Sequence, residues 1–169
     1  MGASDMKEAG WSTGSNFPCL PAILHATAAN REAIARHLLA LDADDRYRRF
    51  GQIVDDAVIL RHVARIDFRR DVVLVAVGAA GGIDVEVLGL AHVALDPPVA
   101  EFGLSVLAGW RGRGFGRRLF IGAIWASTAA GVDSVSCVAG NPAVLDMARA
   151  AGLGIRLSSG EPRATLSLR

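Results

Sequence analysis

The sequence has few cysteines, no long apolar run and no excess of charge of either sign. Its two cysteines, Cys19 and Cys137, lie far apart and form no C-x-x-C or Cys/His ligand spacing. A disulfide framework and a metal site are therefore not indicated, and a reducing cytoplasmic compartment is the expected location. No apolar run reaches the length needed to span a membrane, so no membrane partner is expected.

The charge balance excludes one broad class of function. The chain of 169 residues has 18 Lys and Arg against 17 Asp and Glu, a formal net charge of +1. A protein that works mainly by neutralising a polyanion over a wide face would need a larger excess, so any anion site must be local. Hydrophobic residues make up 51% of the chain, which is enough for one core and excludes disorder as its general state.

The N-terminal segment is predicted to lie outside the folded domain. Residues 1–17 mix charged residues with Gly and Ser and have no apolar h-region, so a secretory signal is not indicated. Met6 stands where an N-myristoylation signal needs Ser or Thr. We therefore expect a flexible tail over residues 1–18 and a single domain over residues 19–169.

Changes of hydrophobic period along the chain predict a mixed α/β fold. The expected order is β-α-α-β-β-β-α-β-α-β-β, with no internal repeat. The expected elements are a strand in 19–25, helices after Asn30 and Asp55, a hairpin of strands 72–77 and 83–95 joined by Gly78–Gly82, a strand over 101–106, a helix ending at Gly131, a strand over 132–139, a helix from Asn141 to Gly152, and closing strands 155–157 and 164–168.

A glycine-rich and arginine-rich turn is the most informative stretch of the sequence. Gly112, Gly114 and Gly116 lie between an expected strand and an expected helix, where a ligand can approach the backbone without obstruction by a Cβ. Exposed N–H groups at such a helix start suit a phosphate. Residues 102–132 contain four arginines and no acidic residue, so this turn is the expected local anion site.

Three other interpretations of this turn were weighed. The glycines could simply fit a tight turn that the arginines solvate. The spacing is not the dinucleotide pattern G-x-G-x-x-G, and no Walker lysine follows, so nucleotide hydrolysis is not indicated. Residues 113–120 partly match the RNA-binding RNP1 pattern, but Arg117 occupies an aromatic position and the stretch has helical rather than strand periodicity, so no nucleic-acid partner is expected.

The same residues resemble the GNAT superfamily of acyl-CoA-dependent N-acyltransferases over about residues 20–169. The superfamily signature (Gln/Arg)-x-x-Gly-x-(Gly/Ala) is matched by Arg111, Gly114 and Gly116, between the strand at Leu104–Val106 and a helix. The resemblance implies an α/β (α+β) fold with a mostly antiparallel central sheet and helices on both faces. It also implies acetyl-CoA as cosubstrate, and homodimers are frequent among similar proteins.

The resemblance assigns eleven residues to binding of acetyl-CoA. The strand residues pair with the pantetheine arm, and the backbone amides of the turn hold the pyrophosphate. Asn141 resembles an asparagine that contacts the cofactor, although a plain helix cap explains it equally well. The residues are Leu104, Ser105, Val106, Arg111, Gly112, Arg113, Gly114, Phe115, Gly116, Arg117 and Asn141.

Glu101 is the candidate catalytic base. Amide formation needs a neutral amine, so a carboxylate must accept a proton from an ammonium, directly or through water. Glu101 begins the strand along which the pantetheine arm is expected to lie, and the alternative is a solvated glutamate paired with an arginine. Many relatives use a tyrosine as the acid that protonates the thiolate, but Ala148 occupies that position, and Tyr47 is the only tyrosine.

The remaining polar candidates are expected to be structural or to select the acceptor. Cys137 lies in an apolar strand run and is expected to be a buried thiol rather than a nucleophile. His62 and His92 show no ligand spacing and are expected to be satisfied structural histidines. In the family the first helices border the acceptor cleft, which makes the charged stretch 42–49 a hypothesis for acceptor selection.

The sequence as a whole predicts an N-acetyltransferase, an enzyme of the acyltransferase class. It would transfer acetyl from acetyl-CoA to an amine in a ternary complex, and the acceptor would be an amine-bearing small molecule or a protein lysine or N-terminus. The alternative is an acyl-CoA-binding regulatory module of the same fold without efficient catalysis, which the missing tyrosine motivates.

Overall fold

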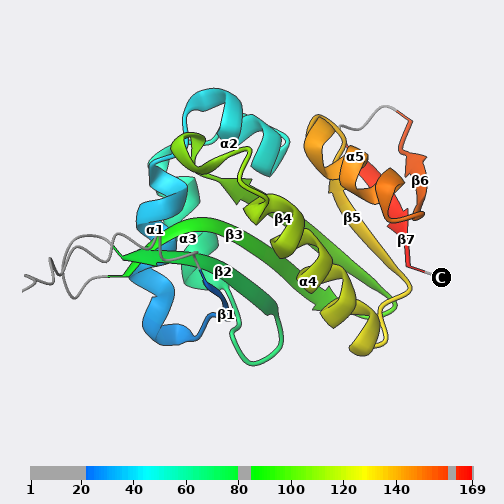
Figure 1. The fold of residues 1–169 in the computed structure, drawn as a ribbon, viewed down its shortest axis with the longest axis horizontal. Helices are drawn as coiled ribbons and strands as arrows, with labels where there is room; N and C mark the ends of the chain where they lie inside the picture. Colours follow the sequence, from blue (N-terminus) through cyan, green and yellow to red (C-terminus); the bar gives the residue numbers. More distant parts are fainter. Residues whose placement is uncertain (1–21, 80–84, 160–162, 169) are drawn as a thin grey trace, which may run out of the picture.

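A computed structural model describes residues 22–79, 85–159 and 163–168 and shows one seven-stranded sheet (Figure 1). The strand order is β1-β2-β3-β4-β5-β7-β6, and every pair is antiparallel except β4 with β5. The expected tail and most of the Gly78–Gly82 loop lie outside the described residues. The strands are β1 (Ala22–His25), β2 (Val72–Ala79), β3 (Val85–Asp96), β4 (Val99–Val106), β5 (Ser134–Val138), β6 (Gly154–Leu157) and β7 (Arg163–Ser167).

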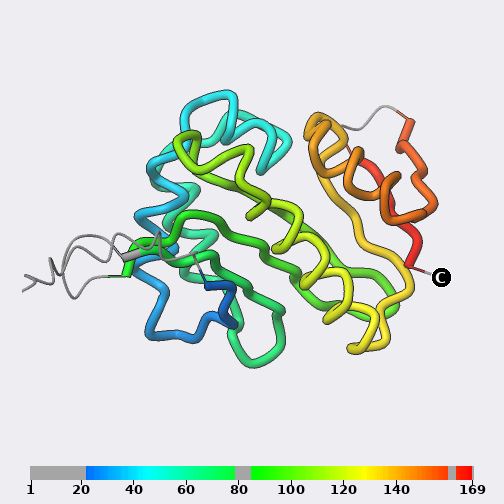
Figure 2. Tube along the Cα trace, viewed as in Figure 1, coloured from blue at the N-terminus to red at the C-terminus, as the bar shows by residue number. Residues whose placement is uncertain are grey.

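Helices cover both faces of this sheet, as Figures 1 and 2 show. Three helices pack with one apolar cluster that includes Val73, Val75 and Leu90 of the sheet. The other two pack on the opposite face around Phe102, Phe120 and Leu166, where the rings of Phe102 and Phe120 meet edge to face at 5.8 Å. The first set is α1 (Arg31–Leu39), α2 (Ala43–Phe50) and α3 (Asp56–Arg65), and the second set is α4 (Phe115–Ala129) and α5 (Pro142–Ala150). The predicted mixed, mostly antiparallel sheet between two helical layers is therefore confirmed.

Helix α2 corrects the element order that was predicted from the sequence. The prediction placed the second helix after Asp55, but the charged stretch from residue 43 forms a helix of its own. Asp42 caps it by accepting a hydrogen bond from the Asp45 N–H at 2.8 Å, and Gly51 ends it with φ of 74°. Polar caps thus define this helix where an apolar period is weak.

A second difference concerns the turn of the β2–β3 hairpin. The hairpin itself is confirmed, but Gly78 and Ala79 pair with Glu86 and Val85 and so continue β2 beyond its predicted end. A strand can extend in this way because glycine and alanine do not prevent pairing when a partner strand is present.

The two faces of β4 have different neighbours, as strand alternation requires. Phe102 and Leu104 are buried in the cluster under α4 and α5. Gly103 and Ser105 point toward the first three helices, since Ser105 bonds to His37 of α1 and a Cβ on Gly103 would meet Arg49 of α2. Glu101 shares this second face by the same alternation.

Strands β4 and β5 pair over a short stretch only. Val99, Ala100 and Glu101 are in register with Ser134, Val135 and Ser136, and no further pairs follow among the described residues. The remainder of β4, from Phe102 to Val106, is paired with β3 on its other side alone. This separation produces an unpaired strand edge in the middle of the sheet.

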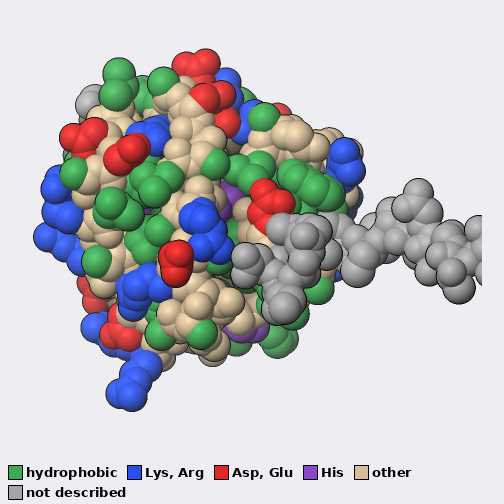
Figure 3. Space-filling view, turned by 90° about the vertical axis from the view of Figure 1, so that its left-hand side faces the viewer, with side chains coloured by type: hydrophobic (Ala, Val, Ile, Leu, Met, Phe, Trp, Pro, Cys, Tyr) green, Lys and Arg blue, Asp and Glu red, His purple; other side chains and the backbone are tan. Residues whose placement is uncertain are grey.

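Surface charge agrees with the near-neutral composition. On the face shown in Figure 3, arginine and acidic side chains are interspersed rather than gathered into one field. Within the described ranges, no helix is long and apolar enough to cross a membrane. The same ranges contain no group of three or more His, Cys, Asp or Glu side chains placed to hold a metal ion.

Candidate active site

A cavity of about 380 Å³ opens where β4 and β5 separate. Ten of the eleven residues that the sequence assigned to the cosubstrate line it; only Arg113 does not. The structure therefore brings the end of β4, the turn at 111–117 and the start of α5 to one place. Six further residues also line it: Asp45, Arg48, Trp110, Pro142, Ala143 and Met147.

The turn places open backbone at the start of α4. Gly112 and Gly114 have φ of 71° and 84°, the left-handed region that side chains disfavour. A Cβ on either glycine would meet no atom within 4 Å, so the space over the turn is free for a ligand. The first N–H groups of a helix have no acceptor within it and form the positive end of its dipole. This cradle fits a pyrophosphate.

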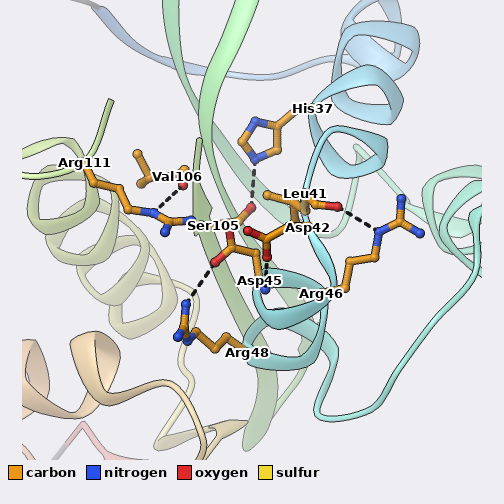
Figure 4. Close-up of polar contacts among 9 residues, drawn as sticks. All are labelled: His37, Leu41, Asp42, Asp45, Arg46, Arg48, Ser105, Val106 and Arg111. Carbon is orange, nitrogen blue, oxygen red and sulfur yellow. Dashed lines mark hydrogen bonds and ion pairs between the residues drawn. The ribbon is translucent and has the colours of Figure 1, made fainter. Parts of the chain in front are cut away.

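The arginines of the turn are held by different partners. The Arg111 Nε donates to the Val106 carbonyl at 3.1 Å, and its Nη2 pairs with the Asp45 carboxylate of α2. Arg48 contacts the other oxygen of Asp45 at 3.2 Å (Figure 4). Arg113 instead stacks over the Trp110 ring, 4.8 Å from its centroid. Asp45 therefore ties α2 to the turn, a link with no local signal in the sequence.

Ser105 is fixed by a buried histidine. The Ser105 Oγ lies 2.8 Å from His37 Nε2 (Figure 4), and His37 Nδ1 lies 2.9 Å from the Val87 carbonyl. Burial lowers the pKa of His37 to about 4, so the ring is neutral at pH 7. Because a carbonyl can only accept, Nδ1 carries the proton and Ser105 donates to Nε2. Sequence reasoning had given His37 no role.

Asn141 stands at the start of α5 and faces the cavity. Its Oδ1 accepts a hydrogen bond from the Val144 N–H at 3.4 Å, which makes it the helix cap. It also lines the cavity, so the cap and the predicted contact with a cosubstrate do not exclude each other. The contact itself stays a prediction.

Glu101 lies at the opposite end of β4 from the turn and does not line the main cavity. Its side chain is 67% exposed, and its Oε1 pairs with Nη2 of Arg163 at 2.9 Å. The Nε of Arg163 also donates to the Ser136 Oγ at 2.9 Å. The arginine partner raised as the alternative is thus present, while an exposed carboxylate remains accessible to an amine or to water.

The other candidates take structural places. Cys137 is buried, and burial raises the pKa of its thiol to about 11, so it is not a ready nucleophile at neutral pH. His92 Nε2 contacts Asp71 Oδ2 at 3.0 Å, as expected of a satisfied histidine. His62 differs from the expectation, because its Nε2 is buried without a hydrogen-bond partner among the residues that the structure describes. Its ring packs edge to face against Phe50 and His92 instead.

The position of the acid that the resemblance leads one to expect carries no ionisable side chain. Ala148, at that position, is fully buried. Tyr47 lies on α2, 42% exposed, with its ring 3.2 Å from the place of a Cβ on Gly140, just before Asn141. The residues around the cavity thus provide open backbone and positive charge, and the buried carboxylate among them, Asp45, is paired with Arg48 and Arg111.

Comparison with solved structures relates this architecture to known proteins. The GNAT domain of S. lividans PAT matches with a TM-score of 0.64 at 17% identity, covering 85% of this chain and 87% of that one. A phosphinothricin acetyltransferase from Sinorhizobium meliloti in complex with AcCoA matches with 0.61 at 19% identity, covering 87% and 85%. A ribosomal-protein-alanine N-acetyltransferase from Brucella melitensis matches with 0.59 at 23% identity, covering 86% and 96%.

Sequence comparison adds no assignment. No family model matches the chain, and a search of curated proteins finds no match. At these identities the structural similarity concerns the arrangement of the backbone. On that arrangement, seven strands between two helical layers with a cavity where β4 and β5 part, this chain has the fold of the GNAT acetyltransferases.

Proposed function

We propose that this protein is an acetyl-CoA-dependent N-acetyltransferase. The observation that carries the proposal is the cavity between β4 and β5, because one site combines an open helix start, glycines with positive φ and an unpaired strand edge. An ordinary nucleotide would use the helix start but not the strand edge. A long, thin ligand with a pyrophosphate at one end and amide groups along an arm uses both.

The chain holds such a cosubstrate at two places. The N–H groups of Phe115, Gly116 and Arg117, at the start of α4, donate to the pyrophosphate. Backbone groups of β4 beyond Glu101 accept and donate along the pantetheine arm, as a neighbouring strand would. From Val106 to Glu101 the strand spans roughly 17 Å, so an extended arm brings the thioester toward Glu101.

Glu101 is the proposed base. Its carboxylate accepts a proton from the acceptor ammonium, and the neutral nitrogen then attacks the thioester carbonyl. A backbone N–H of β4 beside the thioester donates to the developing oxyanion, and the carbon–sulfur bond breaks to release the thiolate of CoA. With Ala148 at the position of the family acid, water carries the second proton that the attacking nitrogen loses to the departing thiolate.

A binding module without efficient catalysis is the second candidate. Two observations favour it: Ala148 leaves no acid, and the Glu101 carboxylate is engaged by Arg163. Both candidates bind acetyl-CoA, so binding alone does not separate them. The acceptor in the first candidate is an amine on a small molecule or on a protein.

Calorimetry and a turnover assay together test the proposal. Titration with acetyl-CoA should show one site per chain with micromolar affinity, and no binding at tens of micromolar would refute both candidates. Release of free CoA thiol is then followed with amino acids, polyamines, aminoglycosides and lysine peptides as acceptors. Binding without thiol release over this panel would favour the binding module.

A further inference from the structure

Arg49 of α2 is a buried cation, and two of its guanidinium nitrogens have no hydrogen-bond partner among the described residues. It is 7% exposed, and its Nε and Nη2 are buried with no hydrogen-bond acceptor in the part of the chain that the structure describes. Its guanidinium lies 5.0 Å from the centroid of the Phe50 ring, which provides a face but no lone pair. Buried polar atoms are nearly always paired, so the two nitrogens point to an acceptor that the described residues do not provide.

The Arg49 guanidinium packs against β4 at Gly103, where no side chain occupies the space. A Cβ on Gly103 would lie 2.0 Å from the Arg49 Nη1 and 2.2 Å from its Cζ. Only glycine at position 103 therefore allows the guanidinium to rest against β4. The close fit shows that Arg49 is built into this position and is not an arginine folded inward at random.

The carboxylates near Arg49 form ion pairs with other arginines. Glu101 is the acid whose charge acts on Arg49, and it pairs with Arg163 at 2.9 Å. Asp45 pairs with Arg48 and Arg111. Burial lowers the pKa of Arg49 to about 10, so the guanidinium keeps its charge at neutral pH. Among the described residues, no carboxylate forms an ion pair with Arg49, although the charge of Glu101 acts on it.

Arg49 reaches the gap between β4 and β5. It lines a small inner cavity of about 10 Å³ that continues the main cavity, since Arg48, Leu104 and Asn141 line both. This is room for about one water molecule, so a carboxylate reaches Arg49 only when the side chains that line this inner cavity move apart. Gly103 and Glu101 lie on one face of β4, two residues or about 7 Å apart.

We propose that Arg49 binds the carboxylate of the acceptor, so that the preferred acceptors are amines that also carry a carboxylate, such as α-amino acids. The inference rests on the proposed acetyltransferase function. With the carboxylate on Arg49, the ammonium of an α-amino acid lies toward Glu101, the proposed base. A planar carboxylate can accept hydrogen bonds from two N–H groups of one guanidinium. A phosphate is larger and fits so small a cavity less well.

Matched acceptor pairs provide the test. Thiol release from acetyl-CoA is measured with phenylalanine against phenethylamine and with leucine against isopentylamine, which differ only in the carboxylate. Two variants disturb the site: Arg49→Met removes the charge, and Gly103→Ala keeps the arginine but displaces its guanidinium. Arg36→Met, an exposed arginine of α1 paired with Glu32, is the control. Unfolding curves confirm that each variant folds.

We expect kcat/KM to be about 10- to 100-fold higher for the amino acid of each pair than for the amine without a carboxylate. This ratio corresponds to the free energy of one hydrogen bond to a charged group. Both site variants should bring the ratio to about 1, and Arg36→Met should leave it unchanged. A carboxylate could also come from the acyl group of the cosubstrate, and calorimetry with succinyl-CoA and acetyl-CoA tests this. A tenfold preference for succinyl-CoA that Arg49→Met abolishes would assign Arg49 to the acyl group and overturn the acceptor assignment.

The remaining outcomes separate the two proposals. Acetyl-CoA binding without any preference for acids, or a preference that survives in Arg49→Met, would overturn the inference and leave the proposed function standing. Failure to bind acetyl-CoA at all would refute the proposed function, and the inference with it.

Discussion

Replacement of Gly114 by leucine tests the phosphate-binding turn most directly, because the chain contains its own control. Gly114 precedes α4 and Gly131 follows it, with φ of 84° and 80°. A Cβ on either would meet no atom within 4 Å. The two substitutions therefore impose the same backbone strain, and only Gly114 lines the cavity.

The expected effects on stability are equal and those on binding are not. A leucine forced into the left-handed region costs about 1–2 kcal/mol, which lowers Tm by roughly 2–8 °C for a chain of this size. At position 114 the side chain also stands over the start of α4. Losing two charge-assisted hydrogen bonds there, at about 1.5–3 kcal/mol each, would weaken acetyl-CoA binding by at least about 100-fold.

Thermal unfolding and calorimetry with acetyl-CoA measure both quantities on the same samples. Gly131→Leu should match Gly114→Leu in Tm and match the unsubstituted protein in Kd to within about twofold. If Gly114→Leu also retained its affinity, the assignment of the pyrophosphate to this turn would be refuted. If both variants lost affinity, general destabilisation rather than the site would explain the loss.

Three further predictions concern single side chains. Glu101→Gln should lower kcat about 100- to 1,000-fold in the thiol-release assay while the Kd for acetyl-CoA stays constant, and full turnover would remove the base assignment. His37 has a pKa near 4 when folded and near 6.5 when unfolded, so its contribution to stability is present above pH 6.5 and falls by about 3 kcal/mol between pH 6.5 and 4. Urea titrations should show a shallower decline in His37→Gln, and an identical pH dependence would contradict this. Phe120→Ala, at a position 1% exposed, should cost about 3–5 kcal/mol of unfolding free energy, and a loss below 1 kcal/mol in urea would show that the core repacks.

The strand, turn and helix around residues 104–117 could be predicted because their signals are local. Alternating polarity marks β4, glycines mark the turn, and the apolar spacing of Phe115 and Leu119 marks the helix. Ten of the residues assigned from this stretch and from Asn141 lie around one cavity. Arg113 does not line the cavity. Its guanidinium stacks on the ring of Trp110 instead.

Helix α2 was not predicted as a separate helix, for a physical reason, and two of the residues that line the cavity, Asp45 and Arg48, lie on it. Its sequence, Ala43–Phe50, carries two aspartates and three arginines in eight residues, so the apolar period that marks a helix is weak. Asp42 before it and Gly51 after it are the signals that could have found it. The roles of Asp45, Arg48 and Arg49 depend on contacts with β4 and the turn, far away in the chain, which no local pattern encodes.

The short parallel pairing of β4 with β5 could not be predicted from local sequence patterns either. Sequence predicted both strands, but register and direction depend on how the β4–α4–β5 connection crosses the sheet. Only the structure shows that pairing ends at Glu101 and Ser136. The cavity exists because of that ending, so its position could be inferred from resemblance but not from the strands themselves.

The three-residue pairing of β4 with β5 also has a consequence for folding. It divides the sheet into an antiparallel unit of β1 to β4 and a smaller unit of β5, β7 and β6. Units joined by so few backbone hydrogen bonds open locally at a lower free energy than the whole chain unfolds. A ligand that touches both β4 and the start of α5 bridges the two units. Amide hydrogen exchange in β5 to β7 should therefore slow more on ligand binding than exchange in β2 and β3, whose pairing is extensive.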